Sequence, residues 1–177
     1  MHNFSTFSKI FTVACVIIRV LGHGVVTTPT PRSYGDVAKS GCGTAVYNVL
    51  TSDLTGPIEN AVAKINDDYD ASECELYFCR ATRIEDNKGN IRTYTAGEVV
   101  NFKINLVAHH TGYANVSIVD LTTQKPIGDP IFNWPVYANQ SLGPADWPKN
   151  ETDFDVTIPD LGGRCTEIGL CAIQWWW

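Results

Sequence analysis

The residues from Val99 to Val107 alternate between apolar and polar side chains, and this period of two is the strongest constraint on the fold. Such alternation gives a strand with one face toward a core and one face toward water. Similar β-branched or aromatic patterns occur at Tyr113 to Leu121, Phe154 to Ile158 and Ala172 to Trp177. Short strands separated by turn residues predict a mostly β chain, an immunoglobulin or fibronectin III-like antiparallel β-sandwich.

The region from Pro29 to Asp70 lacks this alternation and is dense in Pro, Gly, Ser and Thr. Only Pro57 to Ile65 has helical spacing of apolar residues, behind a proline that suits a first helical turn. We therefore expect a long loop region carrying one short helix. The stretch from Asn133 to Lys149, with two Trp-Pro pairs, is expected to be extended and irregular.

Residues 1–22 have the pattern of a secretory signal peptide. Lys9 supplies positive charge, an apolar run follows from Ile10 to Ile18, and Gly22 is a small residue at the expected cleavage point. The apolar run is too short to span a bilayer. The sequence therefore predicts a secreted, extracellular protein that has no membrane segment after the signal is removed.

Cleavage after residue 22 would make His23 the first residue of the exported protein. Arg19 lies between the apolar run and this point, so cleavage after Ala14 or within the later residues is the alternative. Residues 23–177 suit one domain with a core of its own, and we expect a monomer. The formal net charge of −6, which becomes more negative without the signal, argues against nucleic acid and anionic membranes as partners.

Five cysteines follow the predicted signal: Cys42, Cys74, Cys79, Cys165 and Cys171. Disulfides persist in exported proteins, and the last two cysteines flank a short loop across which they could pair. Because five is odd and the sequence stops within a predicted strand, we expect a C-terminal truncation that has removed one partner. A zinc site is the weaker alternative, since no C-x-x-C pair or nearby histidine accompanies these residues.

Three triplets match the acceptor pattern for N-linked glycosylation. They are Asn115-Val116-Ser117, Asn139-Gln140-Ser141 and Asn150-Glu151-Thr152. Three such triplets in a short exported chain favour a eukaryotic glycoprotein.

Histidine placement points to a metal site. After removal of the signal, the histidines are His23, at the new N-terminus, and His109 and His110, directly after the clearest strand. The amino nitrogen and the ring of His23, with one ring of the pair, would give three nitrogen donors. Such a donor set suits Cu(II), the divalent ion that these ligands hold most tightly. The sequence thus predicts copper as the cofactor.

Three motifs together resemble the copper-dependent lytic polysaccharide monooxygenases, in particular the chitin-binding type-4 group with fungal and arthropod secreted forms. The chain has H-G-x-x-x-x-P from His23 to Pro29, A-x-H-x-G-Y from Ala108 to Tyr113, and C-x-x-Q-W from Cys171 to Trp175. The motifs lie at the beginning, middle and end of residues 23–177, so the resemblance covers nearly the whole predicted domain.

The resemblance implies a histidine brace, in which copper is held by the amino nitrogen and ring of the first residue and by a second histidine. These roles match His23 and His110, because the second ligand of the family is the histidine followed by x-Gly. Alternation along a strand sends neighbouring side chains to opposite faces, so we expect His109 not to bind the metal.

The last predicted strand departs from the family pattern, because Trp176 or Trp177 stands where relatives place Tyr or Phe beside the metal. A period of two puts Gln174 and Trp176 on one face. We expect Gln174 to orient bound oxygen and Trp176 to form a wall of the site.

The implied activity is oxidative cleavage of glycosidic bonds in a polysaccharide, chitin or cellulose, with an external electron donor. Two alternatives stay open: a non-catalytic copper-binding protein, and a carbohydrate-binding module. Aromatic side chains could form a sugar-stacking platform, and filling of the core is the competing explanation for them. They are Trp134, Tyr137, Trp147, Trp175, Trp176 and Trp177.

Overall fold

The structure, a computed structural model, describes residues 23–177, so the predicted signal peptide lies outside the described residues. Within residues 23–177, no helix combines the length and apolar character needed to cross a membrane. The strands are β1 (His23–Thr28), β2 (Val99–Ala108), β3 (Gly112–Asp120), β4 (Lys125–Pro126), β5 (Phe132–Tyr137), β6 (Asp153–Thr157) and β7 (Cys171–Trp176). The helices are α1 (Asp36–Ser52) and α2 (Ile58–Val62), with short 3₁₀ turns η1 (Cys79–Ala81), η2 (Glu85–Asn87) and η3 (Lys149–Glu151).

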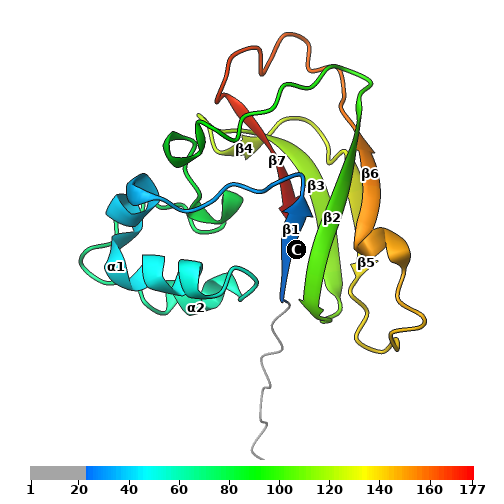
Figure 1. Cartoon of the computed structure of the whole chain (residues 1–177), viewed down its shortest axis with the longest axis horizontal. Helices are drawn as coiled ribbons and strands as arrows, with labels where there is room; N and C mark the ends of the chain where they lie inside the picture. Colours follow the sequence, from blue (N-terminus) through cyan, green and yellow to red (C-terminus); the bar gives the residue numbers. More distant parts are fainter. Residues whose placement is uncertain (1–22) are drawn as a thin grey trace, which may run out of the picture.

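The strands form two antiparallel sheets (Figure 1). One sheet has the order β1-β2-β6, with β2 in the centre. In the other sheet, β3 pairs with β4, β5 and β7. The two sheets share one apolar cluster, to which β2 and β6 contribute from one side and β3 and β5 from the other. The predicted antiparallel β-sandwich is therefore confirmed.

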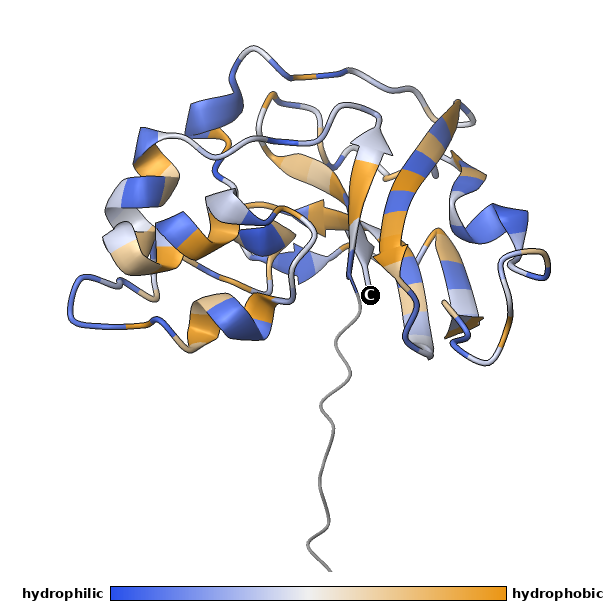
Figure 2. Cartoon of the chain, turned by 60° about the horizontal axis from the view of Figure 1, so that its bottom comes forward, coloured by the Kyte–Doolittle hydropathy of each residue, from blue (hydrophilic) through white to orange (hydrophobic). Residues whose placement is uncertain are grey.

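Strand β2 shows how the sequence pattern builds this core. Val100, Phe102 and Ile104 are buried, while the residues between them are exposed. Figure 2 shows the resulting alternation of hydrophobic and hydrophilic residues along the strand. The rings of Phe102 and Phe154 stack with centroids 5.6 Å apart, directly across the pairing of β2 with β6. The period of two in the sequence thus produces one buried face of β2.

The region predicted as a long loop with one short helix contains a second and longer helix. Helix α2 falls within the predicted residues 57–65, but α1 was not expected. Helix α1 is kinked at Gly43, whose φ of +71° is favourable only for glycine. A disulfide between Cys42 and Cys74 ties α1 to the following loop. The two helices lie to one side of the sandwich (Figure 1) and have a separate apolar cluster of their own.

Strand β5 corrects the prediction that residues 133–149 are irregular throughout. It runs through Pro135, which has no backbone N–H to give to a sheet. The pairing of β5 with β3 is irregular between Gly112 and Ala114, opposite the segment that contains this proline. The pairing of the two strands therefore continues on both sides of Pro135. Strand β1 was also not predicted.

The cysteines follow the sequence argument in part. Cys165 and Cys171 form the local disulfide that their spacing suggested. Cys79 is the cysteine that has no disulfide partner within residues 23–177.

Candidate functional site

The pairing of β1 with β2 brings the predicted ligand residues to one end of the sandwich. His23 opens β1 and lies opposite Ala108, the last residue of β2. His110 follows two residues later, in the short connection between β2 and β3. Residues 23 and 110 are thus neighbours in the fold although 87 positions separate them in the sequence. Both histidines are half-buried.

His109 and His110 have different surroundings. The ring of His109 stacks on Trp147, with centroids 3.7 Å apart and planes 16° apart. The indole Nε1 of Trp147 donates to the carbonyl of Leu142, which holds the stacking partner in place. Burial, and to a smaller extent the nearby His110, lower the pKa of His109. The ring of His109 therefore packs against the loop that follows β5.

Two imidazole nitrogens at this end of the sandwich are buried and have no hydrogen-bond partner among residues 23–177. They are Nδ1 of His23 and Nδ1 of His110. A buried polar atom without a partner loses its interaction with water and gains nothing in return. A metal ion bound by these nitrogens would remove that cost. Within residues 23–177, no group of three or more His, Cys, Asp or Glu side chains is placed to hold a metal, so a site here would need a donor of another kind.

The loop between α1 and α2 and residue Gly24 of β1 line a common opening. Hydrogen bonds from Thr55 and Gly56 hold the pKa of Asp53 below its usual range. Arg80 fastens this loop by donating to the carbonyls of Asp53 and Gly56, at 3.0 and 2.6 Å. No local sequence pattern predicts this arrangement, because it depends on how the helical region folds back onto β1.

Trp175 of β7 and Trp177, which follows the end of this strand, reach into the sandwich beside the histidine-bearing segments. A Cβ on Gly24 would lie 3.1 Å from the ring of Trp175, and a Cβ on Gly112 would lie 3.0 Å from Nε1 of Trp177. Glycine at both positions therefore allows the indole rings to approach the backbone closely. Both rings also pack against Tyr137, which is fully buried. The sequence pattern placed Trp176 or Trp177 beside the metal, whereas the position of Trp175 next to Gly24 was not expected.

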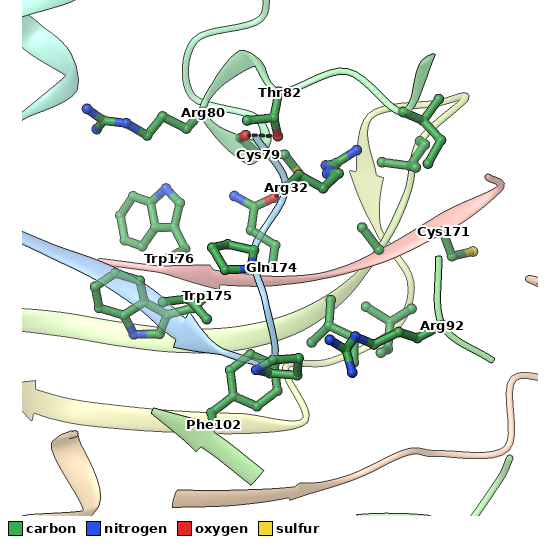
Figure 3. A pocket seen from close by; sticks show the side chains of 18 of the residues that line it. Arg32, Cys79, Arg80, Thr82, Arg92, Phe102, Cys171, Gln174, Trp175 and Trp176 are labelled. Atoms are coloured by element: carbon green, nitrogen blue, oxygen red, sulfur yellow. Dashed lines mark hydrogen bonds between the residues drawn. The ribbon is translucent and has the colours of Figure 1, made fainter. Parts of the chain in front are cut away.

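Trp176 lies on the other face of β7, as its position in the strand predicted. Its side chain is 37% exposed and its ring lies 5.2 Å from that of Tyr113. Figure 3 shows Trp175 and Trp176 on opposite sides of the β7 ribbon. Trp175 and Trp177 pack against the core, so filling of the core, the competing explanation for the aromatic residues, holds for these two. A platform that includes Trp134 and Tyr137 is excluded, since both are buried.

Gln174 shares this face of β7 but lies further from the histidines. It pairs with Ser117, five residues along β3 from Gly112, which is about 16 Å at 3.3 Å per residue. Its Oε1 accepts a weak hydrogen bond from the Cys79 thiol at 3.6 Å. Burial raises the pKa of that thiol, while Arg32 opposes the shift. Figure 3 shows Gln174 pointing toward Arg32 and Cys79.

A cleft of about 1120 Å³ lies between the helical region and β7. His110, Gln174 and Trp176 all contribute to its lining, and Gly24 reaches it from β1. The structure thus brings His23 and His110 to one end of the sandwich and places Trp176 and Gln174 progressively further along the same opening.

The whole of the described region matches a known protein family. The sequence model of the family described as "Lytic polysaccharide mono-oxygenase, cellulose-degrading" matches residues 23–177. The match begins at His23 and includes every residue of the site. No curated protein sequence matched the chain.

Proposed function

Because the chain belongs to the lytic polysaccharide monooxygenase family described as cellulose-degrading, we propose that it is a secreted copper enzyme that cleaves chitin or cellulose oxidatively. The observation that carries the proposal is the meeting of His23 and His110 at one end of the sandwich. The family match begins at the residue that signal removal would make N-terminal. Polysaccharide breakdown is the function of the family, and the metal, substrate and residue roles are our proposal.

The donor atoms at this end of the sandwich fit copper. Nδ1 of His23 and Nδ1 of His110 are buried and have no other partner. Removal of residues 1–22 would add the amino nitrogen of His23, which can chelate a metal together with the ring of the same residue. Imidazole and amine nitrogens are ligands that Cu(II) holds tightly. Bound copper would supply the redox chemistry by which dioxygen or peroxide, with an external electron donor, hydroxylates a sugar C–H bond.

The remaining residues of the site would shape it and would not bind the metal themselves. Trp175 and Trp177 fill the space beside Gly24 and Gly112, which fixes the backbone next to both histidines and keeps water out of the interior. Trp176 would form a wall of the opening. The role of Gln174 in orienting oxygen stays a prediction. To act in this way, the Gln174 side chain would have to give up its hydrogen bond with the Cys79 thiol.

The amino group of His23 must lose its proton before it can bind a metal. An α-amino group has a pKa of about 7.7–8.0, so copper affinity is expected to fall as the pH decreases below this range. A site made only of side chains would not show this dependence on a free N-terminus.

Three measurements on the secreted protein test the proposal. N-terminal sequencing is expected to give His23 as the first residue, and titration with Cu(II) is expected to show one tight site. With a reductant and dioxygen or peroxide, the copper-loaded protein should release oxidised oligosaccharides from chitin or cellulose. A variant with one alanine added before His23 is the matched control and should lose both properties. Copper binding without release would indicate a non-catalytic copper protein, and glycan binding unaffected by a chelator would indicate a binding module.

A further inference from the structure

The outer face of β3 carries three side chains in a row: Tyr113, Asn115 and Ser117. The period of two in a strand puts them on one face, opposite the buried Ala114 and Val116. Tyr113 is 60% exposed, Asn115 is half-buried and Ser117 is 6% exposed, so this face is open to solvent only at its start. The Cα partners of Asn115 are Asn133 on β5 and Trp176 on β7. Asn133 is exposed, and Trp176 is 37% exposed.

Asn115 is the acceptor residue of a glycosylation triplet, and its amide is correctly arranged for modification. Its Oδ1 accepts a hydrogen bond from the hydroxyl of Ser117 at 3.1 Å. Its Nδ2, the atom to which a glycan would be attached, has no hydrogen-bond partner within residues 23–177. Attachment of a sugar would therefore break no interaction of the described structure.

Two exposed aromatic rings flank this amide. Tyr113 precedes Asn115 by two residues on the same face, and Trp176 lies directly across the strand pair. Their ring centroids are 5.2 Å apart and their planes are tilted by 38°, so the two rings pack against each other. Tyr113 is the more exposed of the two, and aromatic faces pack against the apolar C–H face of a sugar ring. We propose that Asn115 carries an N-linked glycan whose first N-acetylglucosamine packs against Tyr113.

The other two triplets lack this arrangement. The residue two before Asn139 is Tyr137, whose side chain is fully buried. Asn139 also uses its Oδ1 to accept from the backbone N–H of Ser141 at 3.0 Å. The residue two before Asn150 is Pro148. Asn115 is thus the acceptor that has exposed aromatic rings both along its own strand and across from it.

Glycopeptide mass spectrometry tests the site. The inference rests on the proposed secretion and is independent of copper, so it can fail while the oxygenase proposal stands. The full chain is expressed in a eukaryotic secretory host and recovered from the medium or, if retained, from the microsomal fraction. We expect N-acetylglucosamine on Asn115, lost in Ser117→Ala and kept in Ser117→Thr. An unmodified Asn115 in the recovered protein would overturn the proposal.

A stability cycle tests the packing of the sugar. The glycan is first trimmed enzymatically to a single N-acetylglucosamine, and Tm is compared between the parent chain and Ser117→Ala. Loss of the sugar is expected to lower Tm by about 2–4 °C, the shift that one contact of this kind gives in a chain of this size. In a Tyr113→Ala background the same loss should change Tm much less, whereas a Tyr113→Phe background should keep the full effect. An equal shift in all three backgrounds would show that the sugar does not pack against the ring.

Discussion

His109 and His110 are adjacent in the sequence but their rings have different partners, and this difference can be measured. His109 is stacked on Trp147, whereas Nδ1 of His110 is buried without a partner. We predict that His110→Ala lowers Cu(II) affinity by at least about a hundredfold, because even residues outside the ligand set typically change metal affinity by about 10–100-fold. His109→Ala is the matched control and should leave the affinity within a few-fold. Isothermal titration of both variants checks this, and equal losses would contradict the assignment.

Glu151 is a buried carboxyl group with an incomplete set of partners. It is 3% exposed, and its Oε2 has no hydrogen-bond partner in the described residues. Burial raises its pKa, although the backbone N–H of Ala138 partly offsets the shift. A raised pKa means that the folded protein binds the proton more tightly than the unfolded chain does. The stabilising contribution of the protonated carboxyl is complete below the unfolded pKa of about 4.3 and is lost as the pH rises through the folded pKa.

We therefore predict that Glu151→Gln, which removes the charge and keeps the shape, raises the free energy of unfolding at neutral pH. Because the carboxyl is protonated in both states in acid, the difference between variant and parent should disappear below about pH 4. Urea unfolding at a series of pH values measures this difference. A constant difference across the whole series would show that packing, and not ionisation, dominates at this position.

Some residues of the candidate site could be predicted from the sequence because their roles depend on chain position. His23 follows the signal-like segment directly, and His110 lies in a recognisable motif after a strand of clear period. The positions of Trp175 and Trp177 beside the two glycines depend on how β7 pairs with β3, which no local pattern specifies. For the same reason, the sequence did not predict that the thiol of Cys79 would contact Gln174.

Among the secondary-structure elements, the sequence predicted the strands that have one buried face. It did not predict the elements that are stabilised by residues far away in the sequence. Strand β2 shows its alternation within its own residues. Helix α1 has Gly35 at its N-cap, with no side-chain cap of its own, and it contains the helix-breaking Gly43. Its first turn is capped by the carboxylate of Asp86, which accepts from the backbone N–H groups of Val37 and Ala38 at 3.0 and 2.9 Å. A cap from about fifty residues away leaves no local signature.

This cap gives a prediction for α1. Asp86→Ala should lower the free energy of unfolding by about 1–2 kcal/mol, because two N–H groups of the first turn lose their acceptor and the helix dipole loses a negative charge. Asp86→Asn keeps one acceptor oxygen and should cost less. Urea unfolding of the two variants checks the order, and equal stability of the parent and Asp86→Ala would show that solvent can replace the cap.

At the scale of the whole molecule, the chain has two apolar clusters that are cross-linked in different ways. The sandwich cluster is built from β2, β3, β5 and β6, and the helical cluster from α1, α2 and the loop that follows. The disulfide Cys42–Cys74 lies inside the helical cluster, where both half-cystines are fully buried. The disulfide Cys165–Cys171 closes a loop before β7. The helical region is small, so it depends more on its cross-link than the sandwich does.

Removal of each disulfide should therefore have effects of different size and location. The cysteines of the first pair are 32 residues apart and those of the second are 6 apart, so loop-closure entropy predicts losses of about 4 and about 2 kcal/mol. In Cys42→Ala/Cys74→Ala, amide hydrogen exchange should become faster in α1 and α2 while β2 keeps its protection, because the cluster that loses the cross-link opens without the sandwich. Cys165→Ala/Cys171→Ala is the matched control and should leave α1 protected. Uniform loss of protection in the first variant would mean that the two clusters unfold together, and that the histidines at the end of the sandwich share the stability of the helical region beside them.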